Sequence, residues 1–581
     1  MPQMLSPSKN NSKPPSSRRD TRYVHLSILL LTSMVAVQDQ APAPWFTDIG
    51  EAAGFSFSHV SGARGEYWFP EIMGGGVGLL DYDGDGLLDI YCVQSGYLPD
   101  AEGNQPDSPP NQLFRNLGID QETGLPHFED VTELVGVGDT KYGMGVACGD
   151  YDRDGDMDLF VTNVGVNVLY RNEGPDKQGV VRFKDITKNS GTEDVRWATS
   201  AAFLDVDGDR DLDLYVVNNL LWHASTETAC FNYFSERDYC SPNNYNAASP
   251  DALFIKGRTR FQDWTPTSGL DAAFGNGLGV APADYDQDGK VDIYVANDAT
   301  PNNLWHNKGR GKYIDKGLLL GCAVNGNGTP EAGMGVQWVD VDQDGDLDLF
   351  MTHLRRETNT FYMNRRGRFT DKTNATGMNA TSLKYTGFGM GFHDYDLDGH
   401  LDLYVVNGAV QAWRQEEIFA EDPYAEPNHL FRGMGGIRFE TIANGGETEH
   451  TAGTSRGAAF GDLDNDGDVD VVYVDRDGRA KLLLNNATGH WIGFRMLDKR
   501  GDEVPGAMIG VTHGGKTIWR LADPAYSYLA SNDPRAHFGL GASDEIEAIS
   551  VRWPSSKIEE FAPLASGAYH VLREGHGLDH K

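Results

Sequence analysis

Short apolar stretches, separated by runs rich in glycine and aspartate, recur along most of this chain. One kind consists of small residues, as at 143–147 and 333–337, and the kind that follows it is β-branched and aromatic, as at 159–162, 214–217 and 293–295. Alternation with a period of two residues and enrichment in β-branched and aromatic side chains are typical of β-strands. The pattern therefore predicts an all-β protein made of many short strands.

Each repeat continues with two further strand-like stretches. The third stretch reads Asn-x-Leu-aromatic, as at 111–116 and 302–307, and the fourth begins Phe-x-Asp, as at Phe128, Phe183 and Phe369. Four antiparallel strands per repeat, with small residues where inner strands crowd an axis, predict the blade of a β-propeller. A linear solenoid is the alternative architecture.

A nine-residue loop with Asp at its first, third, fifth and ninth positions separates the first two stretches of each repeat. Seven copies are present, and none has a substitution at these positions. The candidate metal ligands are Asp81, Asp83, Asp85 and Asp89; Asp150, Asp152, Asp154 and Asp158; Asp205, Asp207, Asp209 and Asp213; Asp284, Asp286, Asp288 and Asp292; Asp340, Asp342, Asp344 and Asp348; Asp394, Asp396, Asp398 and Asp402; and Asp462, Asp464, Asp466 and Asp470.

Four carboxylates in one short loop repel one another strongly unless a cation lies among them. Oxygen-only ligands, with a glycine at position six for a sharp turn, point to calcium. The loops are not EF-hands, because position twelve lacks the required Glu (it is Cys92 in the first copy and Val161 in the second) and a strand follows. The sequence predicts seven structural Ca²⁺ ions. For a single copy, the alternative is an ordinary polar turn rich in Asp and Gly.

The third loop has Arg210 at position six, where the other loops have glycine. A residue other than glycine at positive φ costs about 1 kcal/mol or somewhat more. We therefore expect the third site to be the weakest, or Arg210 to replace part of the metal by pairing with the loop carboxylates.

The order of the stretches predicts how a ring would close. The last repeat has no Phe-x-Asp stretch after Asn485, whereas an unmatched copy at Phe46 precedes the first loop. An N-terminal strand would complete a seventh blade and leave no exposed edge. We expect a seven-bladed β-propeller over residues 45–486, closed by that strand, and a small C-terminal β domain over 487–575.

The repeats resemble FG-GAP/VCBS repeats, the blade units of integrin α-subunit propellers. The C-terminal segment is similar to the ASPIC/UnbV domain found beside such repeats in relatives of cartilage acidic protein, and the matching residues are 490–497, 505–507, 527–533, 537–541 and 551–555. The resemblance implies a secreted calcium-binding protein and carries over no catalytic residue set. Trp519, Tyr526, Tyr528 and Trp553 in this segment are either a carbohydrate-stacking platform or, more simply, its core.

Charge narrows the choice of partners. The chain has 49 Lys plus Arg and 85 Asp plus Glu, a formal net charge of −36. Seven calcium ions would add +14, so the acidity is partly ligand chemistry. Nucleic acid is excluded as a partner because its phosphates would be repelled. We expect a protein or carbohydrate ligand at the surface.

Residues 1–40 have the features of an export signal. Basic residues precede an apolar run over 24–37 that is too short for a comfortable membrane span. We expect a secreted, extracellular or periplasmic protein, with attachment to a cell surface as a variant, and no stable membrane insertion after cleavage. An uncleaved anchor is the alternative.

Five cysteines are present. Cys230 and Cys240 lie ten residues apart in an irregular segment and are candidates for a disulfide that staples a long loop. Cys92 and Cys148 lie on strands and are expected in the core, and Cys322 is left over.

Three long insertions, at 95–110, 220–250 and 408–427, all follow the second strand of a repeat. In a meander they emerge on the face opposite the metal loops, so we expect a plain calcium face and an elaborated insertion face. Long loops on a rigid scaffold commonly carry binding sites. The candidate contacts are Tyr97, Trp222, His223, Trp413 and Arg414, with Tyr239, Tyr245 and Tyr424 beside them. The alternative is that these loops merely pack on neighbouring blades.

Three functions remain open from the sequence: a calcium-stabilised binding or adhesion protein, a polysaccharide-acting enzyme, and a structural cell-surface component. Known catalytic motifs such as Gly-x-Ser-x-Gly and His-Glu-x-x-His are absent from the sequence. Glu71, His223, His353 and His393 are the residues that could meet near a propeller axis. The first function is the one that we favour.

Overall fold

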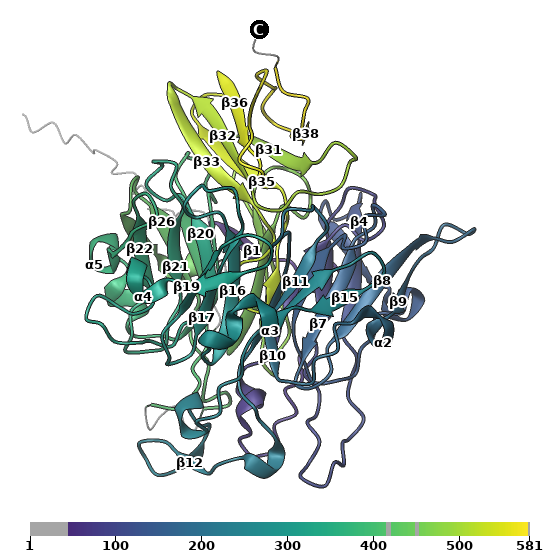
Figure 1. Cartoon of the computed structure of the whole chain (residues 1–581), viewed down its shortest axis with the longest axis vertical. Helices are drawn as coiled ribbons and strands as arrows, with labels where there is room; N and C mark the ends of the chain where they lie inside the picture. The colour runs from purple at the N-terminus through teal and green to yellow at the C-terminus, as the bar shows by residue number, and fades with distance from the viewer. Residues whose placement is uncertain (1–43, 414–419, 448–451, 579–581) are drawn as a thin grey trace, which may run out of the picture. The chain divides into compact units, whose positions relative to one another are not determined.

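The computed structural model describes residues 44–413, 420–447 and 452–578, so the expected signal segment lies outside the described residues. The described chain is mostly β-structure, with only short helices between strands (Figure 1). The prediction of an all-β protein is confirmed.

Within the described residues, seven sheets share one plan: four antiparallel strands with an Asp loop between the first and the second. The first three sheets are β2 (Val77–Leu80), β3 (Asp89–Cys92), β4 (Gln112–Ile119) and β5 (Pro126–Asp130); β6 (Gly143–Gly149), β7 (Asp158–Asn163), β8 (Val168–Pro175) and β9 (Val181–Asp185); and β10 (Ala198–Leu204), β11 (Asp213–Asn218), β14 (Ala252–Lys256) and β15 (Phe261–Asp263). The next three are β16 (Gly277–Ala283), β17 (Asp292–Asn297), β18 (Asn303–Asn307) and β19 (Tyr313–Asp315); β20 (Val336–Val339), β21 (Asp348–Met351), β22 (Thr360–Asn364) and β23 (Phe369–Asp371); and β24 (Gly387–His393), β25 (Asp402–Asn407), β26 (His429–Gly433) and β27 (Phe439–Ile442).

The remaining sheet of this plan takes its fourth strand from the start of the described chain. It consists of β28 (Ser455–Gly461), β29 (Asp470–Asp475), β30 (Lys481–Asn485) and β1 (Phe46–Asp48). Phe46 pairs with Asn485 in antiparallel register. The N-terminal stretch therefore lies where the sequence pattern placed it.

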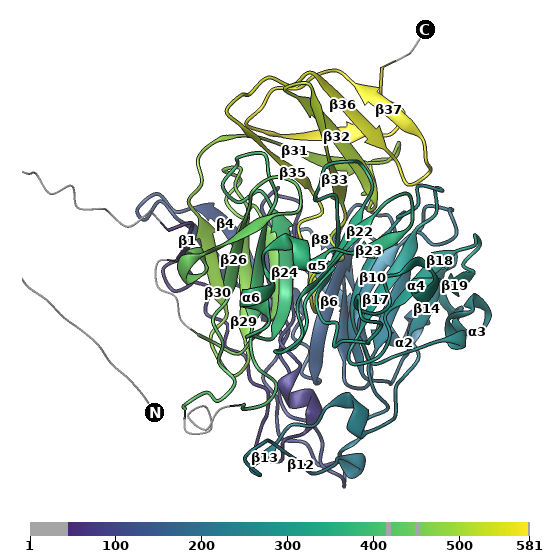
Figure 2. The same ribbon diagram turned by 90° about the vertical axis from the view of Figure 1, so that its left-hand side faces the viewer.

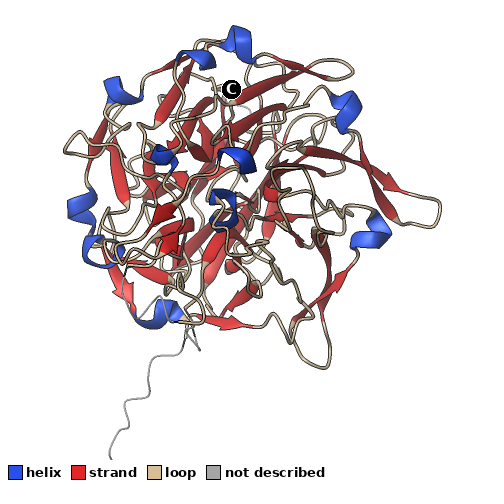
Figure 3. Cartoon of the chain, turned by 90° about the horizontal axis from the view of Figure 1, so that it is seen from below, coloured by secondary structure: helices blue, strands red, loops and turns tan. Residues whose placement is uncertain are grey.

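The first strands of the sheets are almost completely buried and contact one another. The contacts run in the order β2, β6, β10, β16, β20, β24 and β28, and β28 also contacts β2. Figure 3 shows the sheets side by side around a common centre. A Cβ on Gly279 would lie 2.2 Å from the Met334 carbonyl oxygen, and one on Gly335 would lie 2.3 Å from that of Phe388. Small residues are therefore required where these strands approach each other.

Short helices lie between the sheets and in the loops. The α-helical turns are α1 (Thr132–Val135), α2 (Thr187–Ser190), α3 (Thr265–Ser268), α4 (Gly317–Leu320), α5 (Thr373–Thr376) and α6 (Asn379–Ser382). The 3₁₀ turns are η1 (Phe69–Ile72), η2 (Ala224–Thr226), η3 (Pro242–Asn244), η4 (Leu270–Ala272) and η5 (Ala443–Gly446).

The C-terminal residues form two further sheets around a separate apolar cluster. The strands are β31 (His490–Leu497), β35 (Ala536–Gly541) and β38 (Tyr569–Arg573) in one sheet, and β32 (Ala507–His513), β33 (Lys516–Ala522), β36 (Ala548–Arg552) and β37 (Ile558–Phe561) in the other. Trp553 belongs to this cluster and is 2% exposed. Of the two alternatives for Trp553, a carbohydrate-stacking platform or the domain core, the second is therefore right.

Between β33 and β35 the chain leaves the C-terminal sheets and enters the centre of the seven sheets. Its short strand β34 (Ala530–Ser531) pairs in parallel with β2. Leu529 is fully buried and its amide donates to Ser200 of β10, while the Ser527 hydroxyl accepts from the Met390 amide of β24. We call residues 524–533 the central segment. Contact with strands from several sheets places it at their common centre.

The described parts of the three insertions project together at one end of the described chain, with β12 (Cys230–Phe231) and β13 (Arg237–Asp238) among them (Figure 1). The C-terminal sheets lie at the opposite end in both side views (Figures 1 and 2). The expected plain calcium face is therefore wrong: the C-terminal domain covers the Asp-loop side.

Candidate metal centres

Each Asp loop is held by hydrogen bonds from its own backbone. In the second loop, Asp150 accepts from the amides of Asp154 and Gly155, at 3.1 and 3.0 Å. Asp158 accepts from the amide of Asn172 in the third strand, at 2.8 Å. The same three contacts recur in the first and seventh loops. Positions one and nine thus fix the loop, which leaves oxygen atoms of other positions free for a ligand.

The third position supplies such oxygen atoms. In five loops its Oδ1 is buried and has no hydrogen-bond partner among the described residues, and these residues are Asp83, Asp152, Asp286, Asp342 and Asp396. A buried polar atom without a partner costs about 1–3 kcal/mol, and more when it is charged. A cation among the carboxylates would remove this cost. The donor set is all oxygen, which fits calcium.

Without a cation, burial makes the loop carboxyls poor acids. Burial, and after it the charges of neighbouring loop carboxylates, raises the pKa of Asp158 to about 9. Burial is also the main cause that raises the pKa of Asp213 and of Asp348, each to about 8. These are ninth-position residues, so the deepest carboxyl of a loop is the one most in need of a counter-charge.

Basic side chains from the third strand or the turn after it partly supply that charge in three loops. Arg115 pairs with Asp83 at 2.6 Å and Asp85 at 3.2 Å in the first loop. Arg432 makes the equivalent pairs in the sixth loop, and Arg365 in the fifth. Sequence reasoning missed these residues, although the arginine before Asn116 in the third stretch was a visible signal.

The third loop was expected either to be the weakest site or to have Arg210 in place of part of the metal, and the position of the Arg210 side chain tests the second alternative. Its φ of 75° is positive, as the missing glycine requires. The guanidinium pairs with Glu574 of the C-terminal domain at 2.9 Å. The alternative in which Arg210 replaces the metal is therefore wrong, because the side chain turns away from the loop carboxylates to the neighbouring domain.

The seventh loop carries a fifth carboxylate. Asp468, at position seven, is 2% exposed, and neither of its carboxylate oxygens has a hydrogen-bond partner among the described residues. Burial, and then the charges of Asp466, Asp464 and Asp462, raises its pKa to about 9. The second, third and fifth loops also have Asp at position seven, but Asp156, Asp211 and Asp346 are only half-buried, so the seventh loop differs by the burial of this fifth carboxylate.

Six loops also contact the C-terminal domain. In the second loop, Arg153 pairs with Asp498 at 2.7 Å and with Asp502. In the seventh, the Tyr569 hydroxyl donates to Asp462 at 3.0 Å. In the third loop Arg210 pairs with Glu574, and in the sixth the Leu397 carbonyl accepts from the Gly541 amide at 3.0 Å. In the fourth and fifth loops, a Cβ added to Gly289 would lie 2.2 Å from Ser556 Oγ, and one added to Gly345 would lie 3.5 Å from Trp519 Nε1. The Asp loops therefore lie on the surface against which the C-terminal domain packs.

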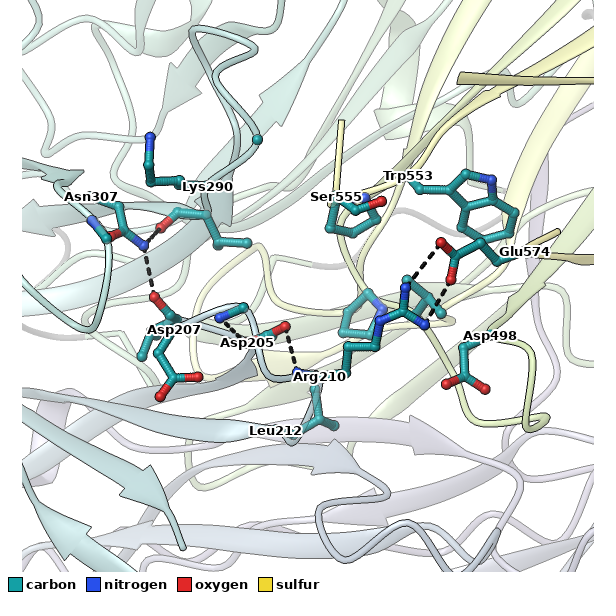
Figure 4. A pocket seen from close by; sticks show the side chains of 18 of the residues that line it. Asp205, Asp207, Arg210, Leu212, Lys290, Asn307, Asp498, Trp553, Ser555 and Glu574 are labelled. Atoms are coloured by element: carbon teal, nitrogen blue, oxygen red, sulfur yellow. Dashed lines mark hydrogen bonds and ion pairs between the residues drawn. The ribbon is translucent and has the colours of Figure 1, made fainter. Parts of the chain in front are cut away.

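A cavity of about 320 Å³ lies at this surface, between the third and fourth loops and the C-terminal domain (Figure 4). Asp205, Asp207 and Lys290 line one side, and Glu574 and Trp553 line the other. The Arg210–Glu574 ion pair crosses it. The cavity is thus lined both by paired charges, such as Arg210 with Glu574, and by the loop carboxylates Asp205 and Asp207.

The insertion-face candidates are spread over several contacts. Trp222 is half-buried against Trp68, and its indole N–H donates to Glu227 at 2.8 Å. Tyr97 lies under the Arg64 guanidinium, and Trp413 lies 4.1 Å from that of Arg356. His223 is exposed and caps η2, and Arg414 lies outside the described residues.

Three further tyrosines pack rather than face solvent. Tyr239 and Tyr424 are buried edge to face, and Tyr245 stacks on Phe69. For these three, the packing alternative is right. The side chains of Trp222, Tyr97 and Trp413 remain partly accessible. Of these three, Trp413 lines a cavity of about 70 Å³ together with Phe69 and Met334.

The four residues considered for catalysis are not brought together. His393 Nε2 lies 2.9 Å from the Tyr526 hydroxyl of the central segment, and Glu71 is buried beside Tyr239 and the Trp68 amide. His353 is buried, and its Nε2 is 4.0 Å from Glu331. His223 is bound to Ser225 in the insertion. The central segment occupies the place where a propeller active site was considered.

Cys230 and Cys240 form a disulfide across the β12–β13 hairpin. Cys92, Cys148 and Cys322 are free and buried. No helix among the described residues has the length and apolar character needed to cross a membrane.

Family models match two parts of the chain. The FG-GAP-like repeat model matches residues 81–161, 150–216, 284–351 and 340–405. The ASPIC and UnbV model matches residues 499–578. The first model thus matches parts of the first six Asp-loop sheets, and the second matches most of the C-terminal sheets.

Curated relatives are similar over most of the chain. Cartilage acidic protein 1 from Homo sapiens is 23% identical over 524 residues, which are 86% of this chain and 62% of the human protein. The protein of the same name from Xenopus tropicalis is 25% identical over 291 residues, 48% of this chain and 42% of its own length. This chain thus spans less than two thirds of these relatives.

Solved structures share less. The BP39L lectin from Burkholderia pseudomallei matches at a TM-score of 0.41 and 10% identity, over 72% of this chain and 97% of the lectin. The exotype rhamnogalacturonan lyase YesX matches at a TM-score of 0.33 and 14% identity, over 71% of this chain and 61% of the lyase. Likeness at this level supports no functional conclusion. The family models and the relatives instead identify the family: the chain is an FG-GAP-repeat protein with a C-terminal ASPIC and UnbV domain.

Proposed function

We propose that this protein is an extracellular binding or adhesion module, whose closed seven-bladed propeller is stabilised by calcium in the Asp loops. The observation that carries the proposal is the set of buried third-position oxygens without partners in five loops. Positions one and nine hold each loop in shape, so the site needs little rearrangement to accept an oxygen-ligated cation. Millimolar extracellular calcium can fill even weak sites of this kind.

Closure of the ring is supported by two observations. The N-terminal strand β1 pairs with β30, and β28 contacts β2. A closed ring removes the strand edges that would otherwise pair with other chains. The central segment adds hydrogen bonds to the innermost strands, so the C-terminal domain also ties the sheets together.

Binding of a partner is assigned to the insertion face. The C-terminal domain contacts six of the Asp loops, which leaves the opposite face open for a large ligand. Half-buried Trp222 and Trp413 offer apolar surface beside polar groups there. Aromatic side chains of this kind are enriched in protein and carbohydrate contacts.

The first test is elemental analysis of the purified secreted protein together with thermal melts in calcium and in chelator. Six or seven calcium ions per chain and a melting temperature lowered by chelator are the expected results. A melt that chelator leaves unchanged would refute structural calcium.

The second test is binding in calcium to a neutral-glycan array and to immobilised matrix proteins. Trp222→Ala should abolish a positive signal, whereas Ile558→Ala, at an exposed position of the C-terminal domain, should retain it. Equal retention by both variants would exclude the insertion face as the binding surface.

A further inference from the structure

The fourth Asp loop has a different donor set from the other loops. Its seventh position is Lys290, whose Nζ pairs with Asp288 at 2.6 Å. One of the four carboxylates is therefore already neutralised. Affinity for calcium decreases when a site has fewer charged ligands, so this loop is a poorer calcium site than a loop with four free carboxylates.

His306 supplies a nitrogen atom to the same loop. It lies in β18 directly before Asn307, whose amide donates to Asp292 at 2.7 Å. Arg115 and Arg432 hold the equivalent place in the first and sixth loops, where their side chains reach the carboxylates. The strand position is thus one that directs its side chain into the loop.

The imidazole is close to two of the carboxylates. Nδ1 of His306 lies 3.2 Å from Asp292 Oδ1 and 3.6 Å from Asp286 Oδ2. One ligand atom each from Asp286, Asp288 and His306 lie within 4.8 Å of one another. His306 is 5% exposed and Asp292 is fully buried. These atoms are near enough to close around a single ion after small side-chain movements.

Two carboxylate oxygens of the site are unsatisfied. Oδ1 of Asp286 and Oδ2 of Asp292 are buried without a hydrogen-bond partner among the described residues. If His306 served only as a hydrogen-bonding core histidine, its contact with Asp292 Oδ1 would leave both of these atoms unpaired. A metal ion between the imidazole and the carboxylates would satisfy them.

We propose that the fourth loop binds a first-row transition-metal dication of the Zn²⁺ class, with His306 Nδ1 and the carboxylates of Asp286 and Asp292 as ligands. Imidazole with carboxylates favours Zn²⁺, Cu²⁺ or Ni²⁺, whereas calcium takes oxygen ligands. The inference rests on the proposal that the Asp loops are metal sites, and it makes one of them distinct in chemistry. The ligating nitrogen must be unprotonated, so its lone pair faces the ion and the ring proton lies on Nε2.

The test uses Zn²⁺ as the probe in the presence of excess calcium. The full secreted chain is dialysed with both metals, freed of unbound ions and analysed for zinc and calcium per chain. One zinc per chain is expected in the wild-type protein. His306→Gln should weaken zinc binding by about tenfold or more.

His400→Gln is the control, because His400 is a histidine at position seven of another Asp loop, the sixth; it is half-buried, whereas His306 is buried. It should keep the zinc. Lys290→Gln is a second variant at an exposed side chain that removes the competing ammonium, and it should tighten zinc binding severalfold. Zn²⁺ gives no electron paramagnetic resonance signal, so the protein is also loaded with Cu²⁺ in place of Zn²⁺. The wild-type spectrum should show hyperfine coupling to a nitrogen ligand, and the spectrum of His306→Gln should lack it.

The outcomes separate this inference from the proposed function. Wild-type protein that holds calcium but no zinc, or equal zinc in wild type and His306→Gln, would overturn the inference and leave structural calcium intact. Protein that holds neither metal would overturn both. Melting of His306→Gln in calcium shows whether a loss of zinc is due to unfolding.

Discussion

Raising the pH from 5 to 8 should destabilise the calcium-free protein and leave the calcium-loaded protein almost unaffected. Asp158, fully buried at the ninth position of the second loop, illustrates the reason. Burial, followed by the charges of Asp152 and Asp150, raises its pKa from 3.8 to about 9. Between these values the folded state holds a proton that the unfolded state has released. Stability therefore falls as the pH rises through this window.

The size of the effect follows from the same values. Each pH unit in the window costs about 1.4 kcal/mol for one such group, so the interval from pH 5 to 8 costs about 4 kcal/mol for Asp158. For a chain of this length the melting temperature changes by roughly 1 °C per kcal/mol, which gives a decrease of about 4 °C. Asp213 and Asp348 act in the same direction. A bound dication keeps these carboxyls ionised and removes the dependence.

The assay is thermal melting by circular dichroism, in buffers freed of metal over a chelating resin, with and without millimolar calcium. Asp158→Asn should remove the contribution of Asp158, so the calcium-free melting temperature should decrease less between pH 5 and pH 8. Asp271→Asn, at an exposed site, should leave it unchanged. The reasoning is refuted if the calcium-free melting temperature is independent of pH, or if calcium does not alter its slope.

Three further outcomes are expected. Asp464→Asn should lower the melting temperature in calcium more than Asp207→Asn, because the seventh loop holds the buried and unpartnered carboxylate of Asp468 whereas Asp207 is exposed; equal losses in melts would contradict this ranking. Leu529→Ala should cost roughly 2–5 kcal/mol, since this side chain is fully buried in the central segment, and a denaturant titration that shows no loss would argue against that placement. Arg153→Ala should weaken docking of the C-terminal domain by about 1–3 kcal/mol, because Asp498 is left buried without its partner. Limited proteolysis should then cut β31–β38 faster, and an unchanged cleavage rate would count against the interface.

The repeating units could be predicted from the sequence because their signals are local. The Asp spacing, the small-residue strand and the Phe-x-Asp strand each fall within one repeat, and strand order follows from short connections. Even the pairing of Phe46 with Asn485 was accessible, since a missing stretch at one end matched a surplus one at the other.

The position of the C-terminal domain could not be predicted in this way. Segment 524–533 mixes small, aromatic and polar residues without periodicity, and it makes contacts with residues hundreds of positions away, as between Leu529 and Ser200. Arg210 shows the same limit. Its positive φ follows from the loop pattern, whereas its pairing with Glu574 depends on a domain whose place was unknown.

The C-terminal domain contacts both the Asp loops and the centre of the seven sheets, and these two unpredicted contacts have one consequence for the proposed metal sites. Arg153 and Tyr569 belong to contacts that join the second and seventh loops to the C-terminal domain, and the central segment of that domain fills the middle of the sheets. A loop that loses its cation gains mutual repulsion at the surface on which the domain rests. Calcium removal should therefore loosen the domain before the sheets separate, because the sheets retain their own hydrogen bonds and buried strands. On the proposal that the Asp loops hold calcium, they would stabilise the contact between the two modules as well as each sheet, which is a reason for an acidic loop in each of the seven described sheets.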